Sequence, residues 1–408
     1  MFRLFVSLAL FALTLGLVVA QEAIRRGTVK ATDPEKGTVT ITVDGKDETF
    51  YLTSDTKVML NNKQVAKPFE EKELKAGSAV MFKSAMKGGK DVLVGLRLGP
   101  PAKAPEIPKV DTSKIKPLPE LGNEKYQGYE GGLYPNRKNE RPKEHNDAGL
   151  TLAKAIQPLD DAGKPSEKGK IVLLSVGMSN TTQEFSAFKR IADADMEKNP
   201  SLVLVDGAQG GMTAARIKDP DDKASGTKYW DAVDQRLKAA GATREQVQIA
   251  WIKEADAGPR DGFPKYAETL RDELRQIVQA MHVRFPNLKI VYLSSRTYGG
   301  YAKTALNPDP YAYESGFSVK WLIEEQIGGD KALNFDPKRG EVKAPWLSWG
   351  PYLWANGTTK NADGLSYEES DFAADGTHPS QAGQRKIAEH MLKFFKNDST
   401  TKPWFVKK

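Results

Sequence analysis

The stretch Lys170-Ile171-Val172-Leu173-Leu174-Ser175-Val176 decides the fold, because it is a continuous apolar run bounded by polar and turn residues. Three similar runs follow at 201–205, 247–252 and 289–293. A strand without polar alternation is typical of a parallel sheet that is covered on both faces. These runs therefore predict an α/β domain built on a parallel sheet.

The segments between and after the runs have helical periodicity. Residues 266–285 place Leu270, Leu274, Ile277, Val278 and Met281 on one face, and 317–327 and 381–395 predict two more helices. The pattern predicts a flavodoxin-like three-layer α/β/α sandwich, with its active site at the carboxyl ends of the strands.

The amino terminus predicts export. Met1-Phe2-Arg3 precedes an apolar run over 4–20 that ends in Val18-Val19-Ala20, the pattern of a signal peptide cleaved before Gln21. The alternative is an uncleaved anchor, although the run is at the short edge of the roughly 17–25 residues that span a bilayer. The chain has no cysteine, which suits a periplasmic or secreted bacterial protein that is stable without disulfides. No later segment predicts a membrane span.

The charge pattern argues against nucleic acid as a partner. The formal net charge is +7, but lysines and acidic residues alternate, as at 193–198 and 218–223, without a basic block. A mixed-charge solvated surface, with at most a weak attraction to acidic polymers, is expected.

Residues 22–98 form a separate compositional unit. Alternating β-branched runs, such as Thr38-Val39-Thr40-Ile41-Thr42-Val43, are separated by turn residues that include Asp44-Gly45. They predict a small all-β, barrel-like domain, which either binds substrate or cell wall or is a structural appendage. A proline-rich linker and an irregular arm (99–148) follow, then the α/β domain (149–397) and a tail (398–408).

Ser179 is the first candidate for chemistry. It follows the first apolar strand in Gly177-Met178-Ser179, and the Thr-x-x-Glu spacing of Thr181 and Glu184 predicts a capped helix start. Free N–H groups at a helix amino terminus stabilise a developing oxyanion. The alternative is an ordinary turn serine. Thr181 replaces the second glycine of the Gly-x-Ser-x-Gly elbow, so that motif is absent.

The second candidate is the pair Asp375 and His378 in Asp375-Gly376-Thr377-His378, just before the last predicted helix. A carboxylate three residues from an imidazole can fix its tautomer, and the imidazole can then take a proton from a serine hydroxyl. The alternative is a turn followed by a helix-start histidine.

Together these motifs resemble the SGNH (GDSL-like) hydrolase superfamily, in which a serine follows strand one and an Asp-x-x-His lies near the carboxyl terminus. The resemblance implies a carboxylic ester hydrolase with Ser179, Asp375 and His378 as its triad. The glycine after strand two in that family corresponds to Gly211, or to the adjacent Gly210, as an oxyanion donor.

The third motif departs from the family. An asparagine usually follows strand three, whereas this chain has Trp251-Ile252-Lys253-Glu254-Ala255-Asp256. The stretch resembles the Trp-x-Gln-Gly-Glu loop of sialate O-acetylesterase-like members, one residue shorter and without the glutamine. Lys253 either replaces the amide in the oxyanion hole or is a surface lysine paired with Glu254 or Asp256.

The substrate is predicted less directly. The aromatic segment 346–354 either forms a sugar-stacking wall or fills the domain edge, and Arg296 binds a substrate carboxylate or an acidic neighbour. The candidate substrate-binding residues are Asn180, Trp251, Arg296, Tyr298, Trp349 and Trp354. We expect an ester substrate, an acetylated glycan in particular, and neither a metal nor a cofactor. Two other readings remain open: an inactive carbohydrate- or envelope-binding protein, and a lipase-like esterase.

Overall fold

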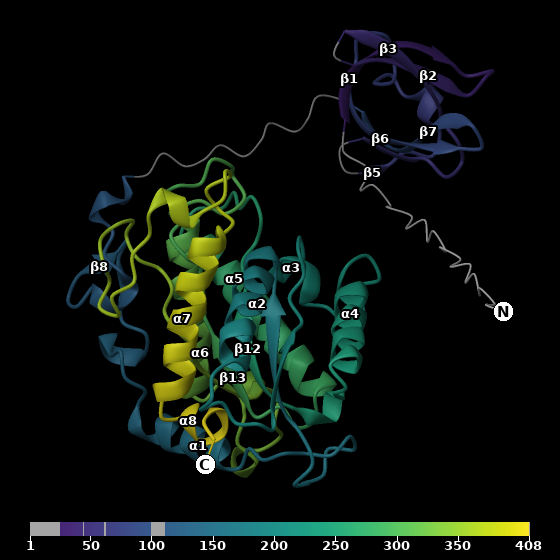
Figure 1. The fold of residues 1–408 in the computed structure, drawn as a ribbon. Coiled ribbons are helices and arrows are strands. Elements are labelled where there is room, and N and C mark those ends of the chain that lie inside the picture. Colours follow the sequence, from purple (N-terminus) through teal and green to yellow (C-terminus); the bar gives the residue numbers. More distant parts are fainter. Residues whose placement is uncertain (1–24, 44, 61–62, 99–110, 408) are drawn as a thin grey trace, which may run out of the picture. The chain divides into compact units, whose positions relative to one another are not determined.

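The computed structural model describes residues 25–43, 45–60, 63–98 and 111–407. The chain forms two compact units that divide between Ala104 and Pro105, each with its own hydrophobic core (Figure 1). The predicted signal peptide (1–20) and most of the proline-rich linker lie outside the described residues. Within those residues, no helix has the length and apolar composition needed to cross a membrane.

The first unit is a closed β structure. Its strands are β1 (Arg25–Asp33), β2 (Thr38–Val43), β3 (Lys46–Tyr51), β4 (Lys57–Leu60), β5 (Lys63–Gln64), β6 (Ala79–Lys87) and β7 (Lys90–Leu98), with a 3-10 turn at Pro68–Glu70. In the described residues they form one sheet in the order β3-β2-β1-β6-β7-β4-β5. A further pairing of β3 with β7 at Tyr51 and Val92 closes five of these strands into a ring.

Strand alternation explains this unit. Along β2, Val39, Ile41 and Val43 are buried and the threonines between them are more exposed, as expected for a sheet with one covered face. The predicted small all-β, barrel-like domain is confirmed. Strands β4 and β5 were not predicted, because four- and two-residue segments carry too little alternation to be recognised.

The second unit contains a parallel sheet. Its strands are β10 (Ile171–Gly177), β11 (Leu202–Asp206), β12 (Val247–Lys253), β13 (Ile290–Leu293) and β14 (Trp346–Trp349), in the order β11-β10-β12-β13-β14. All neighbouring pairs are parallel. Every residue of β10, β12, β13 and β14 is buried. The predicted α/β class with a parallel sheet is confirmed.

Helices connect and cover these strands. They are α1 (Lys143–Lys154), α2 (Ser179–Asp193), α3 (Ala214–Ile217), α4 (Gly226–Ala239), α5 (Lys265–Arg284), α6 (Tyr311–Ile327), α7 (Gln381–Asn397) and α8 (Lys402–Phe405). Helix α2 packs against α7, and α5 packs against α6 (Figure 1). Because parallel crossovers are right-handed, the connection from β10 to β11 and the later connections, which run the other way along the sheet, lie on opposite faces.

Segments outside the predicted domain boundaries also belong to the second unit. In the predicted linker, the backbone N–H of Leu118 donates to the Tyr352 hydroxyl (2.9 Å), and in the predicted arm the hydroxyls of Tyr134 and Ser348 are hydrogen-bonded at 2.9 Å. In the predicted tail, Trp404 and Phe405 are fully buried. Short elements of the second unit are the β8 (Lys125–Tyr126) and β9 (Tyr129–Glu130) hairpin and 3-10 turns at 112–114, 118–120, 135–137, 244–246, 331–333, 337–339 and 369–371.

Candidate active site

Ser179 is the first residue of α2 and is separated from the end of β10 by Met178 alone. A Cβ atom on Gly177 would lie 2.4 Å from the Thr181 hydroxyl oxygen and 2.5 Å from the Lys253 carbonyl, so this tight strand-to-helix passage requires glycine. The first N–H groups of a helix have no intrahelical acceptor. Ser179 is therefore held at the positive end of α2, at the carboxyl edge of the sheet.

The predicted capping box of this helix is wrong. The N-cap of helix α2 is Met178, three residues before the Thr181 that the pattern indicated. The Thr181 hydroxyl instead donates to the Lys253 carbonyl on β12 (2.6 Å), and Glu184 pairs with the Lys253 ammonium. Both side chains that the local pattern assigned to capping therefore bind Lys253 of β12 instead.

The structure brings Ser179 and His378 together from positions 199 residues apart. Ser179 Oγ lies 2.8 Å from His378 Nε2, and His378 Nδ1 lies 2.5 Å from Asp375 Oδ2. The other Asp375 oxygen accepts the backbone N–H groups of Thr377 and His378, each at 3.0 Å. With Nδ1–H donating to the carboxylate, Nε2 is free to accept the serine proton.

Asp375 is held in its charged form. Burial raises the pKa of its carboxyl, but hydrogen bonds from the His378 ring and from two backbone N–H groups outweigh burial, so the pKa lies below its usual range. The carboxylate is therefore ionised at neutral pH, as the orientation and stabilisation of an imidazolium require.

Two contacts fix the loop that carries His378. The Asn180 side-chain amide donates to the Thr377 carbonyl (2.8 Å), and the Lys303 backbone N–H donates to the Asp375 carbonyl (2.9 Å). Gly376 has a φ of +67°, and a Cβ there would lie 1.8 Å from the Tyr301 carbonyl oxygen. Asn180, predicted to bind substrate, is only 1 % exposed and instead positions this loop.

Gly210 and Gly211 lie in the loop after β11. A Cβ on Gly210 would be 3.9 Å from the Ser179 Cβ, so this loop passes beside the serine. The Gln209 N–H donates to the Gly177 carbonyl (2.9 Å), which ties the loop to the end of β10. Within the described residues, the backbone N–H groups of Ser179, Gly210 and Gly211 donate to no protein acceptor. They are thus available to an oxyanion.

Lys253 does not take the place of an oxyanion-hole amide. Its side chain is fully buried, and its ammonium contacts both carboxylate oxygens of Glu184 on α2 at 2.5 Å. Burial lowers its pKa to about 8 against the opposing attraction of Glu184. The expected alternative, a surface lysine paired with Glu254 or Asp256, is also wrong. Successive strand residues point to opposite faces, so Lys253 faces α2 and Glu254 does not.

The other predicted substrate-binding residues are buried structural residues. Trp251 Nε1 donates to Ser294 Oγ (3.0 Å), Trp354 Nε1 to Asp309 Oδ1 (3.2 Å) and Arg296 Nε to Asn307 Oδ1 (3.2 Å). The exposed fractions are 0 % for Trp251 and Trp354, 2 % for Arg296 and Trp349, and 9 % for Tyr298. A substrate at the protein surface cannot reach side chains that are this buried, and the large rings instead fill the interior of the domain.

Asp206 was missed by the sequence analysis. It ends β11 and accepts from Ser175 Oγ (2.7 Å), from Ser186 Oγ (3.0 Å) and from Thr182 Oγ1. It also accepts the Ala208 N–H (3.1 Å), so it joins α2 to the glycine loop. The sequence feature that could have identified Asp206 is an acidic residue at the end of an apolar run, because the carboxyl ends of parallel strands are where binding sites form.

Arg216 was also missed. It is exposed, and its guanidinium donates to the Gly211 carbonyl (2.8 Å). It therefore places a cation on the glycine loop next to the serine. No sequence motif distinguished it from the many other surface cations of this chain.

Comparisons with known proteins give low similarity. No protein-family model matches the chain, and no curated protein sequence matches it. The lipase Lip_vut3 from a goat rumen metagenome is 14 % identical over 55 % of this chain and 97 % of its own, with a TM-score of 0.33. LAE5, an alpha/beta hydrolase from the metagenome of Lake Arreo, Spain, is 14 % identical over 57 % of this chain and 96 % of its own (TM-score 0.32).

A further solved structure resembles a shorter part of the chain. The silver-bound form of CusF from Escherichia coli is 23 % identical over 20 % of this chain and 98 % of its own, with a TM-score of 0.15. All these likenesses are too low to bear on function.

Proposed function

We propose that this chain is an exported serine esterase of the SGNH (GDSL-like) type that hydrolyses carboxylic esters, acetyl esters of carbohydrate in particular. One observation carries the proposal: Ser179 Oγ, the His378 ring and the Asp375 carboxylate form a continuous hydrogen-bonded line, at 2.8 and 2.5 Å. The strand order of the parallel sheet is β11-β10-β12-β13-β14, so β11, its second strand along the sequence, lies at the edge next to β10, its first. This order supports a flavodoxin-like sandwich as the scaffold.

The arrangement supports acyl transfer in two steps. The Ser179 hydroxyl gives its proton to His378 Nε2 as the oxygen attacks the ester carbonyl, and the leaving alcohol then takes that proton as the C–O bond breaks. A water molecule next gives a proton to the same nitrogen and attacks the acyl-serine. The acid departs and the proton returns to Ser179 Oγ.

Backbone groups supply the oxyanion site in this proposal. The N–H groups of Ser179, Gly210 and Gly211 are the donors, and no side-chain amide is needed, since two backbone N–H groups form the oxyanion hole of serine proteases. Removing one donor typically costs about 10²–10³-fold in kcat. The absence of the usual asparagine is therefore compatible with catalysis.

The preference for a glycan ester rests on the solvent exposure of the triad side chains. The side chains of His378 and Asp375 are 25 % and 31 % exposed, so the triad opens onto the protein surface. An ester on a polymer can approach such a site, because its backbone does not have to enter the protein. The resemblance to sialate O-acetylesterase-like loops points to the acetyl group.

The test is an ester panel with purified protein: p-nitrophenyl acetate, its long-chain counterparts, acetylated xylan and acetylated sialic acid. We expect acetate release from at least one glycan, and a loss of ~10³-fold or more in Ser179→Ala and Asp375→Asn. Hydrolysis of long acyl chains alone would instead make the protein a lipase-like esterase. Glycan binding without any hydrolysis would make it an inactive binding protein.

A further inference from the structure

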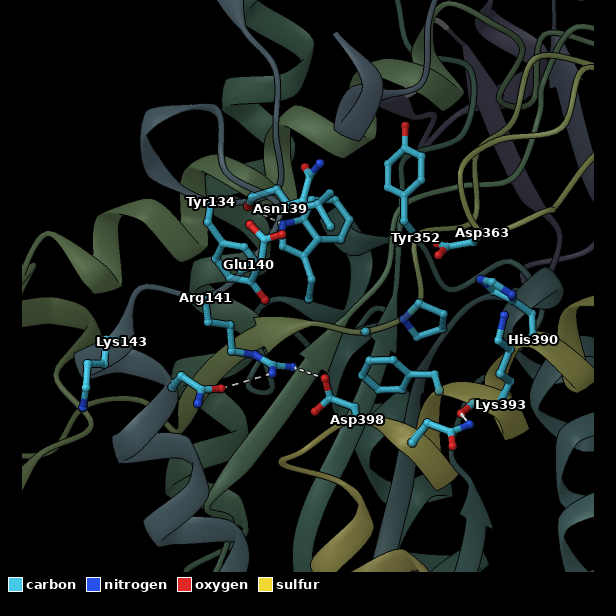
Figure 2. A pocket seen from close by; sticks show the side chains of 17 residues that line it. Tyr134, Asn139, Glu140, Arg141, Lys143, Tyr352, Asp363, His390, Lys393 and Asp398 are labelled. Carbon is cyan, nitrogen blue, oxygen red and sulfur yellow. Dashed lines mark hydrogen bonds and ion pairs between the residues drawn. The ribbon is translucent and has the colours of Figure 1, made fainter. Parts of the chain in front are cut away.

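A concave site lies away from the triad. A cavity of about 670 Å³ that is open to solvent is lined by the arm, the start of α1, the segment that follows β14, and α7; we call it the arm–α7 cavity (Figure 2). Its volume is within the range of about 300–1,000 Å³ that is usual for small-molecule pockets. Neither Ser179 nor His378 nor Asp375 lines it.

The distance between the cavity and the triad can be estimated from the spacing of the strands and the rise of helix α7. Strand β14 is three strands from β10, which at about 4.8 Å per strand is roughly 14 Å. Along α7, the lining residue His390 is ten residues beyond the N-cap Ser380, roughly 15 Å at 1.5 Å per residue. Because these two offsets run in different directions, the cavity lies roughly 20 Å from the serine.

The floor of the cavity is apolar and rigid. Leu133 and Phe394 are partly buried and present apolar surface to the cavity, and the buried residues Tyr134, Trp349, Pro351 and Tyr352 complete this part of the lining. Trp349 Nε1 donates to the Leu133 carbonyl (2.7 Å), and the Tyr352 hydroxyl accepts the Leu118 N–H (2.9 Å). The ring polar atoms are thus engaged within the protein, which leaves the cavity an apolar base that does not need to rearrange.

The rim carries balanced charge. Figure 2 shows Glu140 and Arg141 on one side and Asp363, His390 and Lys393 on the other. Arg141 is neutralised by Asp398 at 2.8 Å. The remaining formal charges are the carboxylates of Glu140 and Asp363 and the ammonium groups of Lys143 and Lys393. Burial lowers the pKa of His390, so its ring is neutral at pH 7.

A balanced rim favours a neutral ligand, because an ion of either sign would meet a like charge as well as an opposite one. An apolar floor with carboxylate, ammonium and amide groups around it suits a molecule with an apolar C–H face and many hydroxyls. Carboxylates and ammonium groups are also the partners that make the stronger hydrogen bonds to hydroxyl groups.

We propose that the arm–α7 cavity binds a segment of neutral carbohydrate, separately from the catalytic serine. The identification of that carbohydrate with the backbone of the ester substrate rests on the proposed function. The separation of roughly 20 Å would then let one polymer chain occupy the cavity and present an ester to Ser179.

The test uses the full chain with Ser179→Ala, so that binding is measured without turnover. Neutral β-1,4-linked tetrasaccharides of xylose, glucose and mannose, and a tetrasaccharide of galacturonic acid, are titrated calorimetrically. We expect one neutral tetrasaccharide to bind more tightly than the acidic one. Replacing both rim carboxylates (Glu140→Ala with Asp363→Ala) should weaken that binding at least ~10-fold, since hydrogen bonds to charged groups are the strong ones.

Two exposed carboxylates next to the cavity but outside its lining provide the matched control: Glu144→Ala with Glu389→Ala should leave the affinity unchanged. The inference is overturned if no neutral tetrasaccharide binds, or if the rim and control variants weaken binding equally. Esterase activity without binding would defeat this inference alone. Binding without esterase activity in the unmodified chain would defeat the proposed function alone.

Discussion

Glu273 on α5 is a buried acid with an incomplete set of partners. One carboxylate oxygen accepts from the Lys218 ammonium at 3.1 Å, and the other has no hydrogen-bond partner in the described residues. Burial, together with the neighbouring Asp256, raises the pKa of Glu273 to about 8. The folded protein therefore holds a proton on this group over a pH range in which the unfolded chain, with a glutamate pKa of about 4.3, has lost it.

This difference predicts a pH-dependent stability. Between about pH 4.3 and 8 the folded state binds the extra proton, so stability falls as the pH rises, by at most about 1.4 kcal/mol per pH unit. Glu273→Gln keeps the shape and removes the titration. Urea unfolding at pH 5 and pH 8 should show a larger loss of unfolding free energy in the wild type than in the variant. Equal losses would mean that Glu273 is already ionised at pH 5.

Single residues also show what sequence could predict at the site. Ser179, Asp375 and His378 were chosen because a hydroxyl, an acid and an imidazole each follow or precede a recognisable element, and parallel strands end at one edge. Lys253 could not be assigned in this way. Its partner Glu184 is 69 residues away, and only the packing of α2 on β12 brings the two together.

At the scale of elements, the turn that carries the histidine is the most constrained. Gly376 combines a φ of +67° with a close approach to the Tyr301 carbonyl. Gly364, in a preceding loop, has a φ of +83° but open space around its missing Cβ. Substituting alanine at Gly364 therefore introduces only the strain of a positive φ, whereas at Gly376 it also introduces a steric clash with the Tyr301 carbonyl.

Gly376→Ala should displace the turn and with it the His378 ring, lowering kcat/KM for an acetyl ester at least ~10-fold, because catalysis is sensitive to shifts of about 1 Å. Gly364→Ala should cost about 1–2 kcal/mol of unfolding free energy, as expected for a left-handed residue, and leave kcat/KM unchanged. Ester hydrolysis and urea unfolding of both variants give the comparison. Equal kcat/KM in the two variants would show that the contact with Tyr301 does not hold the turn.

Elements were predictable where they are long and regular. The predicted helices 266–285 and 381–395 match α5 (Lys265–Arg284) and α7 (Gln381–Asn397) closely. Strand β14 was interpreted as an aromatic rim segment, because Trp346-Leu347-Ser348-Trp349 is only four residues long and its burial comes from the arm and α6. Short elements take their structure from tertiary contacts that local sequence does not contain.

At the scale of the whole molecule, the two units have separate cores, and the division between them falls within the proline-rich linker. The boundary was visible in composition. The membership of the arm and of residues 398–407 in the second unit was not, because irregular segments lack a period even when they are buried.

Separate cores predict that residues 105–408 fold alone and keep the full kcat/KM for p-nitrophenyl acetate, since the triad and its supporting residues all lie in the second unit. Expression of this fragment beside the full chain, with unfolding followed by circular dichroism, provides the measurement. A fragment that is unfolded, or folded with much lower activity on the small ester, would show that the first unit contributes to the site.

The central claim is that Ser179 is an activated nucleophile. The most direct measurement is covalent labelling with a fluorophosphonate, followed by mass spectrometry of the digested protein. We expect one label per chain, on the peptide that contains Ser179, and none in Ser179→Ala. An unlabelled wild-type protein, or a label of the same extent in Ser179→Ala, would contradict it.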